Sequence, residues 1–253
     1  MSSEFLLEVN NISKWNYGLA GAKQLILDDI CFKIKNNSNS GNIVSILAQN
    51  SLSKTTLLKI ISSIEKPSQG NIILFGKEYN KPTGDIAYIP EEPSSFPWMS
   101  VKQNIQYAYE LKNDITNNQK IINELISSVG LDGYENHFPH DKSLGFRFRI
   151  SFARALAVSP KIILFENPFG NLHGETKSEI ISLVNNLTDK LNLTILYTTS
   201  NINEAISVSN KIVLMSSHPG KIINEFEIDK KQNLDLNSDY YNSIKLLIEK
   251  SYK

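Results

Sequence analysis

Short apolar runs alternate with longer amphipathic stretches through most of the chain. The runs at 43–47, 71–75, 85–89, 161–165 and 193–198 have the length of strands. Because helical stretches separate most of them, they predict a parallel sheet covered by helices on both faces. In such sheets, ligands bind at the carboxyl ends of the strands. The residues that follow these runs are therefore candidates for a site.

Helices are predicted in the stretches between and after these runs, because apolar residues recur there at helical spacing. Ser100 is a suitable N-cap for one of them. The last is an amphipathic tail, whose apolar Tyr241, Ile244, Leu247 and Ile248 are predicted to pack on the core and not on a membrane. The predicted helices span residues 51–64, 100–111, 118–129, 146–158, 173–191 and 238–250.

The first forty residues show a different pattern, with alternating apolar and polar positions at 5–12 and 25–34. This alternation predicts two or three antiparallel strands. Trp15 and Tyr17 are predicted to lie in the turn between them, where an aromatic ring either stacks on a base or packs at the sheet edge. Cys31 has apolar neighbours and is predicted to be a buried thiol.

Composition and charge narrow the classes of function. The 253 residues are 41% hydrophobic, which fits one globular domain, and 26 basic side chains balance 26 acidic ones. A net charge of zero argues against an extended surface for nucleic acid, so no nucleic-acid partner is expected. No stretch approaches the roughly 18 apolar residues of a membrane span, and the first residues do not resemble a signal peptide. We therefore expect a soluble, cytoplasmic protein.

The strongest candidate for chemistry follows the first of the central strands, where a loop leads into a predicted helix. In this setting the pattern G-x-x-x-x-G-K-[ST] makes a phosphate cradle: backbone N–H groups face the anion, the Lys reaches the outer phosphates and the hydroxyl holds Mg²⁺. Lys54 and Thr55 match the last two positions, and Ser51, Ser53 and Thr56 complete the candidate nucleotide contacts. The alternative is a solvated lysine at the start of a helix.

The glycines of this pattern are absent. Ala48 and Ser53 stand at the two glycine positions, and Ser51 stands where many such loops have a third glycine. Glycine is used there because the loop needs positive φ or a close backbone approach, and another residue in the left-handed region costs roughly 1–2 kcal/mol. If two positions are strained, the cradle is disfavoured by roughly 2–4 kcal/mol, or about 30- to 1000-fold in phosphate affinity.

Motifs beyond this loop extend over most of the chain. The runs SLGFRFRISFARALA and PKIILFENPFGNL begin at residues 143 and 160, and FPWMSV and KIVLMSSHPGKI begin at residues 96 and 211. These segments resemble the signature motif, the second nucleotide motif, the membrane-subunit docking loop and the C-terminal segment of ABC transporter ATP-binding subunits. The resemblance covers roughly residues 5–227 and, within the family, points to the nitrate, sulfonate and taurine importer type.

The resemblance implies a P-loop NTPase (ABC ATPase) fold of the α/β class, with a mostly parallel RecA-like sheet, an antiparallel β lobe and a helical subdomain. Residues 1–230 are expected to form the nucleotide-binding domain, with its helical subdomain at about 94–158, and residues 231–253 a C-terminal helical tail. The resemblance also implies ATP and Mg²⁺ as ligands, a membrane permease as partner, and a peripheral place on the inner face of the cell membrane.

Several positions depart from the pattern of the family. Glu166 stands where the family has an Asp on Mg²⁺, and Glu91 where it has a Gln that joins Mg²⁺ and the lytic water to the membrane subunit. Asn167 takes the place of the catalytic Glu. A neutral amide cannot accept a proton from water, so about 10²–10⁴-fold of general-base catalysis is unavailable there. Ser200 replaces the switch His, and His173 replaces an Asp that reaches across the dimer.

The signature keeps Ser143 and Gly145, which in this family face the nucleotide of a second subunit. We therefore expect a degenerate subunit that hydrolyses ATP poorly or not at all. We expect it to pair with an intact ATPase as a heterodimer in preference to a homodimer. Two alternatives stay open: an active ATPase with Glu166 as the base, and a nucleotide-free structural or regulatory subunit. Glu166 itself is either a metal ligand or a contact to a neighbouring loop, and Glu91 is either a metal ligand or an exposed turn carboxylate.

Overall fold

The structure is a computed structural model that describes residues 3–17, 21–36, 40–92, 94–112, 119–140, 142–232 and 235–252. Its strands are β1 (Phe5–Tyr17), β2 (Lys23–Lys35), β3 (Asn42–Leu47), β4 (Gln69–Leu74), β5 (Lys77–Tyr79), β6 (Ile86–Ile89), β7 (Ile162–Phe165), β8 (Thr194–Thr199), β9 (Lys211–Met215) and β10 (Ile222–Glu227). Its helices are α1 (Ser51–Ile61), α2 (Val101–Glu110), α3 (Gln119–Ser128), α4 (Leu144–Ala157), α5 (Gly174–Leu191), α6 (Ile202–Val208) and α7 (Asp239–Ser251).

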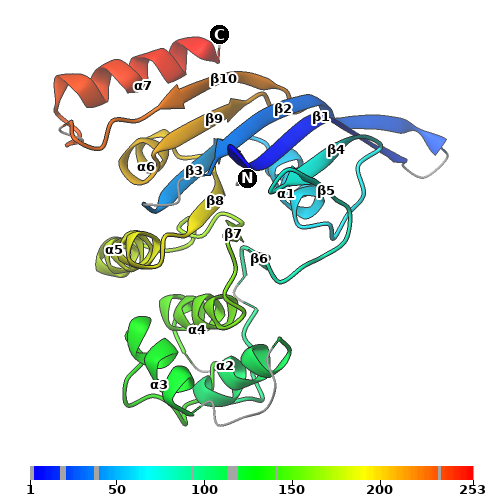
Figure 1. The fold of residues 1–253 in the computed structure, drawn as a ribbon. Coiled ribbons are helices and arrows are strands. Elements are labelled where there is room, and N and C mark those ends of the chain that lie inside the picture. The colour runs from blue at the N-terminus through cyan, green and yellow to red at the C-terminus, as the bar shows by residue number, and fades with distance from the viewer. Residues whose placement is uncertain are drawn as a thin grey trace.

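The strands form two sheets (Figure 1). One is an antiparallel sheet of four strands in the order β2-β1-β4-β5, and the other has six strands in the order β10-β9-β3-β8-β7-β6. In the larger sheet the strands from β9 to β6 are parallel, and β10 runs antiparallel to β9. The predicted fold, a mostly parallel sheet with an antiparallel β lobe, is confirmed.

Helices α2, α3 and α4 lie together beyond β6 and β7, at the opposite end of the molecule from α7 (Figure 1). Helix α2 packs on α3 and α4, and α4 also contacts β6 and α5. This group is the helical part of the predicted fold. A capping box formed by Ser100 and Gln103 begins α2, as predicted for Ser100. Helix α3 begins at Gln119, and the predicted start at Asn118 lies outside the described residues.

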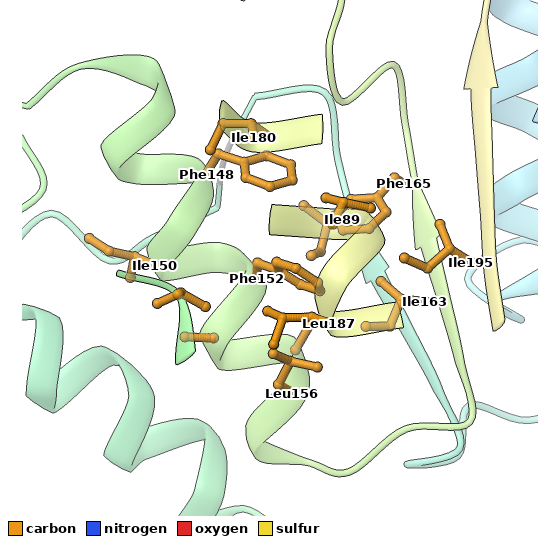
Figure 2. Packing of buried hydrophobic residues seen from close by; sticks show 14 of the residues in the cluster. Ile89, Phe148, Ile150, Phe152, Leu156, Ile163, Phe165, Ile180, Leu187 and Ile195 are labelled. Atoms are coloured by element: carbon orange, nitrogen blue, oxygen red, sulfur yellow. The ribbon is translucent and has the colours of Figure 1, made fainter. Parts of the chain in front are cut away.

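Burial on both faces explains why the central strands are unbroken apolar runs. Every residue of β3 and β7 is buried, which is expected of parallel strands between two layers. Phe148 and Phe152 of α4 both pack against Phe165 of β7, with ring centroids 5.4 Å apart in each pair (Figure 2). These rings fix α4 on the strand whose carboxyl end carries Glu166.

Two predictions for the N-terminal strands are wrong. Trp15 and Tyr17 lie in β1 and not in a turn, because β1 stays paired with β2 as far as Tyr17. Cys31 is exposed, although Ile30 and Phe32 on either side of it are buried. Successive side chains of a strand point to opposite faces, so burial of both neighbours places Cys31 on the outer face.

The C-terminal helix α7 packs on the core, as predicted. Tyr241 and Ile248 are buried in a cluster with residues of α6 and β9, whereas Leu247 is half exposed. The Tyr241 hydroxyl donates a hydrogen bond to Asn203 Oδ1 at 2.7 Å. Within the described ranges, no helix combines the length and the apolar character needed to cross a membrane.

Truncation of Phe152 tests the role of the aromatic cluster under β7. Phe152 is fully buried, so we expect Phe152→Ala to lower the free energy of unfolding by about 3–5 kcal/mol in urea denaturation. The matched control is Phe138→Ala, because Phe138 is 44% exposed. It should cost about 1 kcal/mol or less. Equal losses in the two variants would contradict this assignment of the core.

Candidate nucleotide-binding site

The connection between β3 and α1 is short and unstrained. Helix α1 begins at Ser51, and its N-cap Asn50 accepts a hydrogen bond at Oδ1 from the backbone N–H of Ser53 at 3.3 Å. No residue from 48 to 53 has positive φ. The condition of two strained positions is therefore not met: Ala48 precedes the helix with negative φ, and Ser51 and Ser53 lie within it.

The side chain of Ser53 has a contact that glycine could not make. Its hydroxyl lies 3.3 Å from the carbonyl oxygen of Ile26 in β2 and 3.5 Å from that of Ser217 in the β9–β10 turn. Ser53 and Thr56 are buried, whereas Ser51 is exposed at the start of the helix. The serine at the glycine position thus ties α1 to the antiparallel sheet.

Lys54 is buried and turned back onto the loop. It is 6% exposed, and its Nζ donates a hydrogen bond to the carbonyl oxygen of Ala48 at 2.8 Å. Burial lowers the pKa of Lys54, and the nearby carboxylates of Glu91, Glu204 and Glu166 oppose this shift. The alternative of a solvated lysine is wrong, since the side chain is buried and its ammonium is hydrogen-bonded to the loop.

Glu166 joins three elements at the carboxyl edge of the parallel sheet. Its Oε1 accepts a hydrogen bond from the hydroxyl of Thr55 in α1. Its Oε2 accepts one from the hydroxyl of Tyr88 in β6 at 2.5 Å. Burial, and then contact with Glu166, raise the pKa of Tyr88, so its hydroxyl stays a donor. Glu166 therefore contacts two neighbouring elements, and its role as a metal ligand stays a prediction.

Thr55 and Glu166 also have the chemistry of a magnesium site. A hydroxyl and a carboxylate are hard oxygen donors of the kind that Mg²⁺ prefers, and the two side chains already meet. Within the described residues, no group of three or more His, Cys, Asp or Glu side chains could hold a metal. A magnesium ion at this point would therefore depend on Thr55, Glu166 and oxygens of a bound phosphate.

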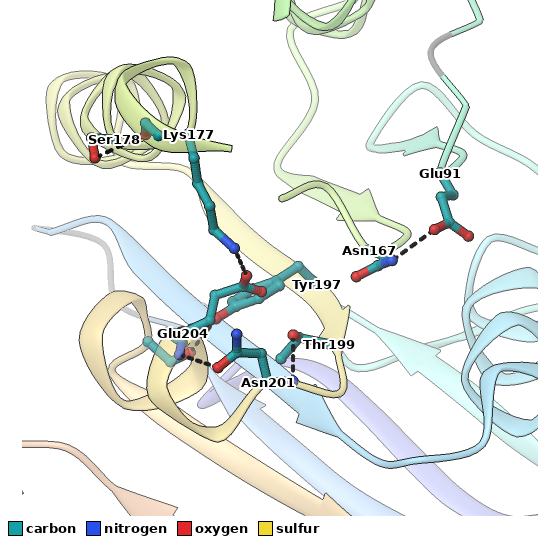
Figure 3. A network of polar contacts seen from close by, with 10 residues as sticks. Glu91, Asn167, Lys177, Ser178, Tyr197, Thr199, Asn201 and Glu204 are labelled. Carbon is teal, nitrogen blue, oxygen red and sulfur yellow. Dashed lines mark hydrogen bonds and ion pairs between the residues drawn. The ribbon is translucent and has the colours of Figure 1, made fainter. Parts of the chain in front are cut away.

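Asn167 and Glu91 form a second polar contact, between the segments that follow β7 and β6 (Figure 3). Asn167 Nδ2 donates a hydrogen bond to Glu91 Oε1 at 2.7 Å, and Asn171 Nδ2 lies 3.4 Å from the same oxygen. Asn167 has positive φ, and its backbone N–H donates to the Thr198 hydroxyl at 3.0 Å. A Cβ on Gly170 would lie 2.2 Å from Asn167 Nδ2, so glycine leaves the room that this amide needs. Glu91 is exposed, as one of its two alternatives held.

The carboxyl end of β8 carries a buried ion pair that the sequence did not indicate. Glu204 in α6 is paired with Lys177 of α5 at 2.9 Å (Figure 3). The N-cap of α6, Asn201, accepts the backbone N–H of Glu204 at 3.1 Å. Ser200 is exposed, and its carbonyl oxygen lies 3.4 Å from Gln49 Nε2. The pair is hard to foresee, because Lys177 and Glu204 lie on different helices.

The remaining predicted contacts lie on other parts of the fold. Ser143 is the exposed N-cap of α4 and accepts the backbone N–H of Phe146 at 3.3 Å. Gly145 is buried, and a Cβ there would lie 2.6 Å from Thr176 Cγ2 of α5. The ammonium of Lys23 sits 4.4 Å from the ring centroid of Trp15.

Tyr17 is exposed at the end of β1. Within the described residues, no hydrogen bond or ring contact joins the Lys54 loop to any of four predicted contacts: Tyr17, Trp15, Ser143 and Gly145. The structure thus groups Lys54, Thr55, Glu166, Asn167 and Glu91 at one edge of the sheet, and leaves the other predicted contacts outside this group.

Replacement of Ser53 by glycine distinguishes the strained loop from the capped helix. Relief of strain would stabilise Ser53→Gly, whereas the structure predicts a loss of about 1 kcal/mol, because glycine is disfavoured in a helix and the hydroxyl contacts disappear. The free energy of unfolding in urea measures the difference. Ser53→Ala is the control, since it removes the hydroxyl but keeps the helical backbone, and it should cost less than Ser53→Gly.

Comparison with known proteins places this site in a family. The profile of the family described as ABC transporter matches residues 28–170. The aliphatic sulfonates import ATP-binding protein SsuB of Bacillus cereus is 32% identical over 239 residues, which are 94% of this chain and 92% of that protein. The nitrate import ATP-binding protein NrtC of Synechococcus elongatus is 30% identical over 213 residues, which are 83% of this chain and 32% of that protein.

Solved structures agree on the fold. The ATP-binding cassette MJ0796, as a dimer bound to ADP and Pi, aligns with a TM-score of 0.75 at 24% identity, over 88% of this chain and 99% of that one. The protein cbiO1 of Clostridium perfringens aligns with the same TM-score at 21% identity, over 98% of this chain and 100% of that one. Since the family profile covers more than half of the sequence and SsuB aligns over nearly all of it, the chain belongs to the ABC transporter family, as one of its ATP-binding proteins.

Proposed function

We propose that this chain is the ATP-binding subunit of an ABC importer of the sulfonate or nitrate type. The observation that carries the proposal is the meeting of Lys54, Thr55 and Glu166 at the carboxyl edge of the parallel sheet. Importer proteins of this kind are among its relatives, including SsuB and NrtC. The chain binds ATP with Mg²⁺, a general property of the family.

In this proposal Lys54 contacts the outer phosphates, and Thr55 and Glu166 hold Mg²⁺. Both sets of groups are hydrogen-bonded within the protein, Lys54 to Ala48 and Thr55 to Glu166. A nucleotide has to replace these contacts, which lowers its net binding energy. Weak ATP binding is therefore expected. Trp15 and Tyr17 remain candidates for stacking on the base.

Hydrolysis by this chain is proposed to be slow. Asn167 is a neutral amide at the position of the family's catalytic carboxylate, and both oxygens of Glu166 already accept hydrogen bonds from hydroxyl groups. The amide of Asn167 cannot take a proton from water, and Glu166 in this proposal is engaged by Mg²⁺ and by Tyr88. The alternative of an active ATPase with Glu166 as the base is disfavoured, because both oxygens of Glu166 already accept hydrogen bonds. A nucleotide-free structural subunit is favoured only by the contact between Lys54 and Ala48.

The partners follow from the same proposal. A membrane permease docks on the helical subdomain at about 94–158, and a second ATP-binding subunit with intact motifs places its nucleotide against Ser143 and Gly145. A heterodimer is favoured over a homodimer, because the intact phosphate loop and catalytic carboxylate of the second subunit then face Ser143 and Gly145 and make one competent site, whereas a homodimer has the substituted motifs in both. Residues 1–230 are proposed to form the nucleotide-binding domain, and residues 231–253 an amphipathic helical tail that packs on it. The complex lies on the cytoplasmic face of the cell membrane.

Lys54→Ala tests nucleotide binding directly. Loss of a hydrogen-bonding ammonium at the phosphates should weaken a non-hydrolysable ATP analogue about 10- to 100-fold in a titration with Mg²⁺. Lys59→Ala is the matched control, because Lys59 lies in the last turn of the same helix and should leave affinity unchanged. Equal affinities of wild type and Lys54→Ala would contradict the proposal and support the nucleotide-free alternative. Turnover by the isolated chain should stay below about 1 s⁻¹.

Trp98→Ala tests docking of the permease. Trp98 is 70% exposed and stacks on Phe96, which is also covered by the guanidinium of Arg154 at 4.1 Å. A fixed and exposed ring of this kind suits the centre of an interface, and its removal should weaken the complex by about 2 kcal/mol, or roughly 30-fold. Co-purification with a co-expressed, tagged permease measures this loss. Leu236→Ala is the control, because Leu236 is also apolar and is 60% exposed. It comes just before α7, the helix at the opposite end of the molecule from α2 (Figure 1).

A further inference from the structure

Three carboxylates act electrostatically on the buried ammonium of Lys54, and contacts link two of them to its loop: Glu166 meets Thr55, the residue after Lys54, and Glu91 meets Asn167, the residue after Glu166. They belong to Glu91, Glu204 and Glu166, and each raises the pKa of Lys54 against the effect of burial. They come from three places in the fold: Glu91 follows β6, Glu166 follows β7 and Glu204 lies in α6. A carboxylate near a phosphate-binding lysine is a candidate to accept a proton from an attacking water, provided that one of its oxygens is open.

In two of the three carboxylates, neither oxygen is accessible to water without a change in the structure. Glu166 accepts a hydroxyl hydrogen bond at each oxygen, from Thr55 and from Tyr88. Only 2% of the Glu204 side chain is exposed, and its Oε2 is paired with Lys177. Its other oxygen, Oε1, is also buried. Neither side chain can meet a mobile water without the loss of an existing contact or entry of water into the core.

Glu91 differs from both. Its side chain is exposed, and Asn167 Nδ2 lies 2.7 Å from Oε1 (Figure 3). Asn171 Nδ2 lies 3.4 Å from the same oxygen. Within the described residues, no group donates a hydrogen bond to Oε2. Two amides therefore hold the carboxylate in one orientation and leave one of its oxygens available to water.

We propose that Glu91 is the general base for the slow ATP hydrolysis of this chain, and that Asn167 is a positioning residue that orients it. The inference rests on the proposed function, because it requires ATP at Lys54. The carboxylate that activates water then comes from the segment after β6, and the amide that faces it comes from the segment after β7.

The step balances as an ordinary hydrolysis. The water oxygen forms a bond to the γ-phosphorus, and the bond from this phosphorus to the bridging oxygen of the β-phosphate breaks, with its electron pair leaving on ADP. The proton that the water loses passes to Glu91 Oε2, and from there to solvent. Asn167 takes no part in bond making. It keeps Oε1 engaged, so that Oε2 is the acceptor.

Single-turnover hydrolysis by the full chain, with protein in excess over ATP and with Mg²⁺ present, tests the assignment. Glu91→Gln keeps the size of the side chain and removes the base, so the rate should fall by about 10²-fold or more. Affinity for a non-hydrolysable ATP analogue should change by less than about threefold, because only the transition state uses the base. Glu92→Gln is the matched control: Glu92 is the exposed neighbour, and its variant should hydrolyse ATP within about twofold of wild type.

A second experiment uses chemical rescue. Glu91→Ala opens space beside an exposed site, and added formate should restore part of its lost turnover, whereas formate should not change the rate of Glu92→Ala. A Glu91→Gln rate within about threefold of wild type would overturn the inference, as would a wild-type chain that binds the analogue but shows no turnover. A wild-type chain that does not bind the analogue would instead refute the proposed function.

Discussion

The parallel pairing of β3, β8, β7 and β6 is the constraint on which the site depends. In this register Leu47 lies beside Thr199, and Phe165 lies beside both Tyr197 and Ile89. The strands therefore end side by side, and the residues that follow them meet at one edge. Because the strand interiors are buried on both faces, polar chemistry is confined to this edge.

The loop at this edge has replaced glycine flexibility with side-chain contacts. Asn50 caps α1, and the hydroxyl of Ser53 lies between the carbonyl oxygens of Ile26 and Ser217. Lys54 and Thr55 are hydrogen-bonded to Ala48 and Glu166 without any ligand. These contacts stabilise the site in its present form, and for the same reason they would compete with the proposed phosphate and Mg²⁺. Weak binding would follow from this competition and not from backbone strain.

Three carboxylates near one buried ammonium give an excess of negative charge. Each of them is compensated by a different set of partners. Glu204 has a cationic partner in Lys177, Glu166 has two hydroxyl donors, and Glu91 has amides at one oxygen and solvent around it. Burial of a charge is tolerated only where a partner or hydrogen bonds compensate for lost water. Of the three, only Glu91 is exposed, so solvent reaches this carboxylate and not the other two.

The sequence by itself determined the buried strands, the long helices and the positions of Lys54, Thr55 and Glu166, because local period and spacing encode them. It did not indicate β5, α6 or β10, which are short and weakly periodic. Tertiary structure alone decided that the loop is capped and not strained. It also decided that Cys31 faces outward and that Tyr88, Lys177 and Glu204 belong near the site. These outcomes depend on contacts between segments far apart in the chain, and the local sequence pattern does not predict which segments will come into contact.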